Sequence, residues 1–152
     1  MGSIEVICGS MFSGKTEELI RRLKRLSYAN KTFKVFKPEV DTRNKKNSIL
    51  SHSKIEIEAQ SVNKAAEILK HKESFDVIGI DEAQFFSDDI VEVCNKLANS
   101  GVRVIVAGLD MDYSGKPFGP MPSLMAIAEE VSKVHAVCCL LYTSPSPRDD
   151  QT

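Results

Sequence analysis

Residues 9–16 combine two glycines, a lysine and a threonine at a spacing that suits phosphate binding. They read Gly-x-x-x-x-Gly-Lys-Thr and lie between a short apolar run at 4–8 and a helical pattern at 16–30. The glycines allow a tight loop whose N–H groups converge on phosphate oxygens, and the following helix adds partial positive charge at its N-terminus. The lysine of such a loop reaches the β- and γ-phosphates, and the threonine hydroxyl holds Mg²⁺. The motif predicts a nucleotide-phosphate site made of Gly9, Ser10, Met11, Phe12, Ser13, Gly14, Lys15 and Thr16.

Two acidic residues follow the apolar run at 75–80. Ligands of open α/β sheets bind at the carboxyl ends of the strands, so Asp81 is expected to bind Mg²⁺ there, directly or through water. Glu82, the next residue, could take a proton from a nucleophile. A helix cap or a solvated turn is the alternative for such a pair, and the phosphate loop in the same chain favours the chemical roles.

Short apolar runs alternate with helical patterns along the chain. We expect strands at 4–8, 33–37, 55–58, 77–81, 102–109 and 134–138. Helices are expected at 16–30, at 62–71 with Ser61 as N-cap, from 87–89 to a stop at Gly101, and at 123–131, with a polar loop at 41–53. This alternation predicts an α/β fold of the P-loop NTPase type (RecA-like), with a mainly parallel sheet flanked by helices.

Composition narrows the class of protein. The chain has 152 residues, 42% of them hydrophobic and 27% charged, which fits one globular domain. Its 20 basic and 21 acidic residues argue against a protein that lives on nucleic-acid phosphate. No apolar run approaches the ~18 residues of a membrane span, and no signal peptide is recognisable, so a cytoplasmic location is expected. Cys8 and Cys94 lie in apolar runs and are expected to be buried.

The motifs alone leave two function classes open. One is a small-molecule kinase, in which the γ-phosphate passes to a bound alcohol. The other is a P-loop ATPase that acts with nucleic acid or as part of a motor, since Asp-Glu-Ala-Gln at 81–84 resembles the DExx boxes of such proteins. The balanced charge, the short chain and the lack of interleaved basic and aromatic residues oppose the second class.

Four segments together resemble the type II (cellular, bacterial and poxviral) thymidine kinases. They are GSMFSGKTEELIRR, KPEVDTR, IGIDEAQFF and GLDMDYSGKPFGPMP, and the resemblance runs from about residue 4 to residue 138. It implies transfer of the γ-phosphate of ATP, with Mg²⁺, to the 5′-hydroxyl of thymidine, which makes dTMP in nucleotide salvage. It also implies feedback inhibition by dTTP, a homo-oligomer that is usually a tetramer, and no nucleic-acid or membrane partner.

The resemblance also implies roles for individual residues. Glu82 corresponds to the general base and Arg43 to a charge stabiliser of the transition state, with Asp41 near the phosphates and metal; a solvated Asp41–Arg43 pair is the alternative. Apolar and aromatic residues correspond to the wall of the thymine site, with core packing as the alternative: Met11, Phe85, Leu109, Tyr113 and Phe118. No role is assigned to Gln84.

The pattern of the family breaks near the end of the sequence. Family members continue with a Cys-x-x-Cys, a second metal-binding pair and a lasso that closes over thymidine, whereas Cys138 and Cys139 are adjacent here and no Cys or His follows. A complete zinc site is therefore not expected. We expect a truncated kinase domain at 1–139, without the zinc-ribbon and lasso domain, and a disordered, foreign-looking tail at 140–152. Such a chain would bind ATP and Mg²⁺ but hold thymidine weakly.

Overall fold

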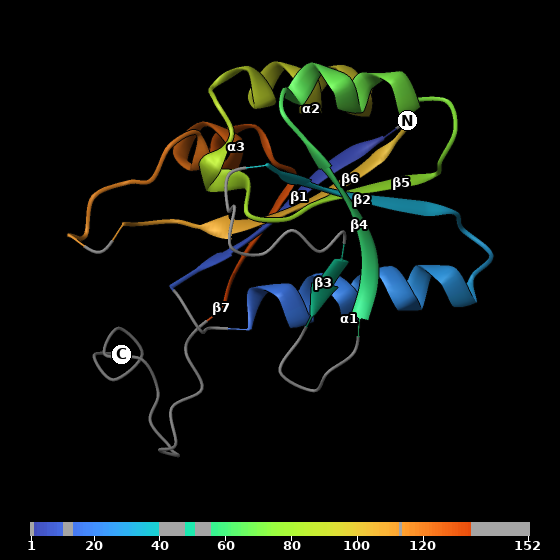
Figure 1. Ribbon diagram of the computed structural model, residues 1–152, viewed down its shortest axis with the longest axis horizontal. Coiled ribbons are helices and arrows are strands. Elements are labelled where there is room, and N and C mark those ends of the chain that lie inside the picture. Colours follow the sequence, from blue (N-terminus) through green and yellow to red (C-terminus); the bar gives the residue numbers. More distant parts are fainter. Residues whose placement is uncertain (1, 11–13, 40–47, 51–55, 113, 135–152) are drawn as a thin grey trace, which may run out of the picture.

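A seven-stranded sheet in the order β3-β4-β2-β5-β6-β1-β7 organises the computed structural model (Figure 1). The structure describes residues 2–10, 14–39, 48–50, 56–112 and 114–134. The strands are β1 (Ser3–Gly9), β2 (Phe33–Pro38), β3 (Ser48–Leu50), β4 (Glu56–Val62), β5 (Val77–Ile80), β6 (Arg103–Leu109) and β7 (Glu130–Val134). Every neighbouring pair is parallel except β3 and β4, which are antiparallel. The predicted mainly parallel α/β fold is confirmed.

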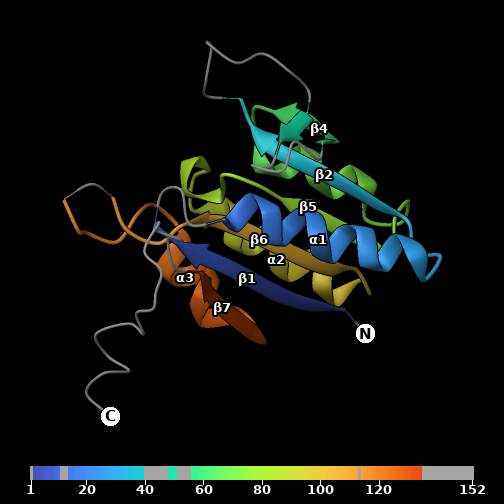
Figure 2. The ribbon, with the colours of Figure 1, turned by 90° about the horizontal axis from the view of Figure 1, so that it is seen from below.

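Helices cover both faces of this sheet. The α-helices are α1 (Lys15–Tyr28), α2 (Asp89–Asn99) and α3 (Met121–Ile127), and the 3₁₀ helices are η1 (Ala65–His71) and η2 (Ala83–Phe85). Figure 2 shows α1 across the near face and α2 on the far side. In β1 the alternation of side chains feeds both layers, because Val6 packs in the cluster under α2 and Ile7 in the cluster under α1.

Two glycines let α1 take its place. Gly14, immediately before the helix, has a left-handed backbone (φ 86°) that favours glycine. Gly79 in β5 lies under the helix, and a Cβ there would be 3.3 Å from Cδ1 of Leu23. Leu19, Ile20 and Leu23, at helical spacing, form the buried stripe of α1. The absence of a side chain at 79 thus brings this stripe close to the sheet.

The predicted elements mostly hold, with differences between β2 and β5 and near the end of the described chain. The predicted loop at 41–53 contains β3 within its described part, at 48–50. The strand expected at 55–58 runs on to Val62, so Ser61 is a strand residue and not a cap, and the helix after it is the 3₁₀ helix η1. Ile57 and Ala59 are buried and Glu58 and Gln60 exposed, and this period of two makes a longer strand.

The end of the described chain also differs from expectation. Helix α3 begins at Met121 and ends at Ile127, earlier than the predicted 123–131. Residues 130–134 form β7 beside β1, whereas the strand predicted at 134–138 lies beyond the described residues after its first member. Gly101 ends α2 with φ 100°, as predicted, and Cys8 and Cys94 are buried. No described helix has the length and hydrophobicity that crossing a membrane requires.

A buried glutamate joins β1 to its neighbours. Glu5 is 6% exposed, and its carboxylate accepts hydrogen bonds from Arg22 Nη1 of α1 (3.0 Å) and from Arg103 Nε of β6. Arg22 also donates to Glu18 Oε2 at 2.7 Å and to Ser132 Oγ of β7 at 3.0 Å. Because its guanidinium contacts three elements at once, Arg22 holds α1, β1 and β7 in register.

Replacing Arg22 with methionine is expected to destabilise the fold by about 3 kcal/mol, because it leaves the buried carboxylate of Glu5 without one of its two cations. Arg21→Met is the matched control. Arg21 also pairs with Glu18, but its side chain is 54% exposed, so the loss should stay below about 1 kcal/mol. Urea unfolding of the two variants measures the difference. Equal losses of stability in the two variants would show that burial of the Glu5 carboxylate does not require Arg22.

Candidate functional site

Three neighbouring strands deliver the predicted site residues to one edge of the sheet. β6 lies between β5 and β1, and all three are parallel, so their carboxyl ends meet. β1 leads into Ser10 of the phosphate loop, β5 into Asp81 and Glu82, and β6 into Asp110. This edge is where open α/β sheets bind ligands.

The described part of the phosphate loop contacts the acidic strand end directly. Thr16 Oγ1 donates a hydrogen bond to Asp81 Oδ2 at 3.2 Å, so the two residues predicted to hold Mg²⁺ lie side by side. Lys15 Nζ donates to the carbonyl oxygen of Ser10 at 2.7 Å, and the ammonium thus lies back over the loop. Glu18 N–H donates to the carbonyl oxygen of Gly14, which begins the hydrogen-bond ladder of α1.

Burial and neighbouring charges shift the pKa values of Asp81 and Lys15, at the centre of the site. Burial, and after it the negative charge of Glu82, raises the pKa of Asp81 to about 6. The Glu82 N–H and the Thr16 hydroxyl, which both donate to the Asp81 carboxylate, oppose this rise in its pKa. Burial lowers the pKa of Lys15, and the carboxylates of Glu82, Asp81 and Asp110 act in the opposite direction. The site therefore places three acids, Glu82, Asp81 and Asp110, near the ammonium of Lys15.

Asp110 is an acid at this edge that the sequence analysis did not assign. It is 7% exposed, and its Oδ2 accepts a hydrogen bond from Lys133 Nζ of β7 at 2.8 Å, while its Oδ1 is buried without a hydrogen-bond partner. The signal was available, because Asp110 directly follows the longest β-branched run just as Asp81 follows its apolar run. Asp110 follows β6, which lies beside the strand that leads into the phosphate loop. Asp81 follows β5, the next strand of the sheet.

The oxygen donors at this edge fit Mg²⁺. A hydroxyl (Thr16) and a buried carboxylate (Asp81) are adjacent, and hard oxygen ligands are those that Mg²⁺ prefers. Among the described residues no three His, Cys, Asp or Glu side chains form a metal-binding group on their own. Mg²⁺ is usually bound by one or two carboxylates together with substrate phosphates and water.

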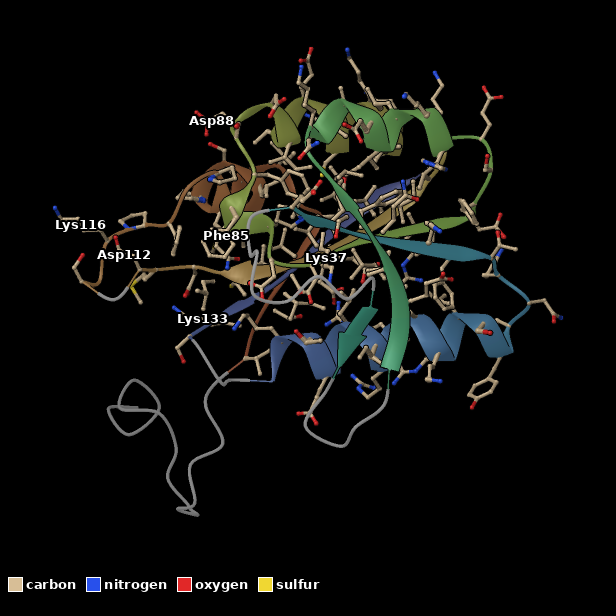
Figure 3. The ribbon with its side chains drawn as sticks, in the orientation of Figure 1. Lys37, Phe85, Asp88, Asp112, Lys116 and Lys133 are labelled. Carbon is tan, nitrogen blue, oxygen red and sulfur yellow. The ribbon has the colours of Figure 1, made fainter. Side chains whose placement is uncertain are left out.

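A pair of aromatic residues lies on the side of the molecule that carries these acids. The rings of Phe85 and Phe118 meet edge to face, with centroids 5.5 Å apart and planes at 88°. Phe85 is 46% exposed, and Figure 3 shows it toward the same end of the molecule as Lys133. Leu109 is half-buried and pairs in register with Gly9 of β1. Three of the five residues predicted to line a base pocket therefore lie at the edge that carries the phosphate loop.

Several predicted residues lie outside the described part of the chain. They are Met11, Phe12 and Ser13 of the loop, the pair Asp41 and Arg43, Tyr113, and the cysteines Cys138 and Cys139. The roles expected for them stay predictions.

Comparisons with known proteins agree with the resemblance. A family model described as thymidine kinase matches residues 2–150. A thymidine kinase of Bacteroides fragilis (strain YCH46) is 59% identical over 137 residues, which is 90% of this chain and 69% of the relative. Thymidine kinases of Porphyromonas gingivalis (strain W83) and Rhodothermus sp. (strain ITI 518) are 58% and 54% identical, over 90% and 92% of this chain and 67% and 66% of their own lengths.

Replacing Asp81 with asparagine is expected to leave the nucleotide-free fold at least as stable at pH 8. The folded state favours the neutral acid, so ionisation of Asp81 as the pH rises from about 4 through its pKa of about 6 costs stability, at most about 3 kcal/mol. The advantage of the variant should shrink as the pH falls from 8 to 5. Thermal unfolding across this range measures it, with Asp88→Asn, an exposed acid, as control. A marked loss of stability at pH 8 would contradict this account.

Proposed function

Because the chain belongs to the thymidine kinase family, we propose that it transfers the γ-phosphate of ATP to the 5′-hydroxyl of thymidine and so makes dTMP for nucleotide salvage. The observation that carries the proposal is the hydrogen bond from Thr16 Oγ1 to Asp81 Oδ2, which joins the phosphate loop to the acidic strand end. Glu82 comes next along the chain, so a proton acceptor lies beside the place where phosphate would be held.

The residues of this edge would divide the work as follows. The N–H groups of the loop and the ammonium of Lys15 bind the β- and γ-phosphates, for which Lys15 leaves the carbonyl of Ser10. Thr16 and Asp81 would hold Mg²⁺, which neutralises charge on the phosphates. Glu82 takes the proton of the 5′-hydroxyl as the new O–P bond forms and the bond to the β-phosphate breaks, with ADP leaving with the electron pair.

The base would lie against the aromatic side of the site. Phe85, Phe118 and Leu109 supply flat and apolar surface there, which suits a pyrimidine ring. We assign Met11 and Tyr113 to the same wall, Asp41 to the nucleotide and Arg43 to charge stabilisation in the transition state, by resemblance to the family. A cytoplasmic location, feedback by dTTP, a tetramer and the division into residues 1–139 and 140–152 are further proposals of the same kind.

An ADP-release assay tests the proposed reaction and separates it from the nucleic-acid ATPase alternative. ADP release stimulated by thymidine supports the kinase. Stimulation by single-stranded DNA and not by thymidine would overturn it. The thymidine kinase of Bacteroides fragilis is assayed in parallel as the positive control. Its activity shows that a lack of ADP release by this chain does not come from a failed assay.

Glu82→Gln should lower kcat at least about a hundredfold while sparing ATP binding. General-base catalysis contributes typically ~10²–10⁴-fold, and the swap is nearly isosteric, so the strand end should keep its packing. Steady-state kinetics and calorimetry with ATP measure the two quantities. Glu73→Gln, which makes the same change at an exposed position before β5, is the control. A variant with near-normal kcat would show that Glu82 is not the base.

A further inference from the structure

Gln84 is buried, and both the nitrogen and the oxygen of its side-chain amide form hydrogen bonds. It is 3% exposed and belongs to η2, the 3₁₀ turn after the acidic strand end. Its Nε2 donates to Glu82 Oε1 at 2.7 Å, and its Oε1 accepts from the N–H of Leu109 at 3.0 Å. These partners determine the orientation of the amide, because reversing it would put an N–H group against an N–H group and an oxygen against a carboxylate.

The backbone around Gln84 is shaped to hold it. A Cβ at Gly108 would lie 2.9 Å from Gln84 Oε1 and 2.8 Å from Met121 Sδ. A Cβ at Gly119 would lie 2.4 Å from the carbonyl oxygen of Gln84, and Gly119 has a left-handed backbone (φ 53°). Two glycines thus leave room for this residue on β6 and on the segment before α3. Gly108 leaves space for the side-chain amide, and Gly119 leaves space for the main-chain carbonyl.

Glu82, by contrast, is exposed and sits on a strained backbone. Its φ of 53° and ψ of 41° place a non-glycine residue in the left-handed region, which is unfavourable and recurs at functional sites. An exposed glutamate samples several side-chain conformations unless a partner restricts it. The buried amide of Gln84 is such a partner, and it engages Oε1 of the carboxylate.

We propose that Gln84 is a positioning residue for the phosphoryl transfer. Its amide holds the carboxylate of Glu82 in the direction that accepts the 5′-hydroxyl proton, and it ties that carboxylate to the backbone of Leu109, beside the aromatic wall. This inference rests on the proposed function. It assigns to Gln84 no contact with substrate, since the residue acts through Glu82.

Two substitutions separate positioning from simple packing. Gln84→Glu keeps the shape and an oxygen for the Leu109 N–H, but it replaces the donor toward Glu82 with a second acidic group. Gln84→Met keeps the length and removes both hydrogen bonds. Each should lower kcat about 10- to 100-fold, the cost of a misplaced catalytic group, and leave the KM and Kd for ATP within about twofold. Gln60→Glu, an exposed position on β4, is the matched control.

A double-mutant cycle decides the case. If Gln84 acts through Glu82, adding Gln84→Met to Glu82→Gln should lower kcat no further, because the base that it positions is already gone. A full additional loss in that background, or wild-type kcat in both single variants, would overturn the inference and leave the proposed function standing. Because weak binding of thymidine is expected, the wild-type chain is assayed at saturating thymidine. The absence of thymidine-stimulated ADP release under that condition would overturn the proposed function itself, and this inference with it.

Discussion

The position of β6 between β5 and β1 is the constraint on which the site depends. Because the three strands are parallel, the ends that carry the phosphate loop, Asp81 and Asp110 all reach the same edge. Crowding buried acids in this way is unfavourable by itself, as the raised pKa of Asp81 indicates. The ammonium of Lys15 and the hydroxyl of Thr16 offset part of that cost. The arrangement is thus stabilised by the groups that would bind a nucleotide.

The remaining structure serves to keep this edge in place. Glu5, buried on β1, is held by Arg22 from α1 and Arg103 from β6, so the strand that leads into the loop is tied to a helix and to a neighbouring strand. Lys133 crosses from β7 to Asp110 and ties the last described strand to the same edge. The pair of Glu5 and Arg103 joins strands that are 98 residues apart in sequence, and these ion pairs restrict relative movement of the strands that carry the site.

What the sequence could predict was local. The phosphate loop and the acid pair at 81–82 were found because each is a short pattern next to an apolar run, and the alternation of such runs with helical patterns predicted the parallel sheet. Ser61 was misassigned because serine suits both a helix cap and the polar face of a strand end. Gln84 received no role because its partner Leu109 lies 25 residues away, on a strand that reaches it only in the folded chain.

The most direct measurement of the central claim is a crystal structure of the chain with thymidine and a non-hydrolysable ATP analogue with Mg²⁺. The account predicts that Lys15 Nζ exchanges the carbonyl of Ser10 for phosphate oxygens, that Thr16 and Asp81 face the metal, and that Glu82 lies within hydrogen-bond distance of the 5′-oxygen. A complex in which the nucleotide sits on the loop while Glu82 points away from the 5′-oxygen would contradict it.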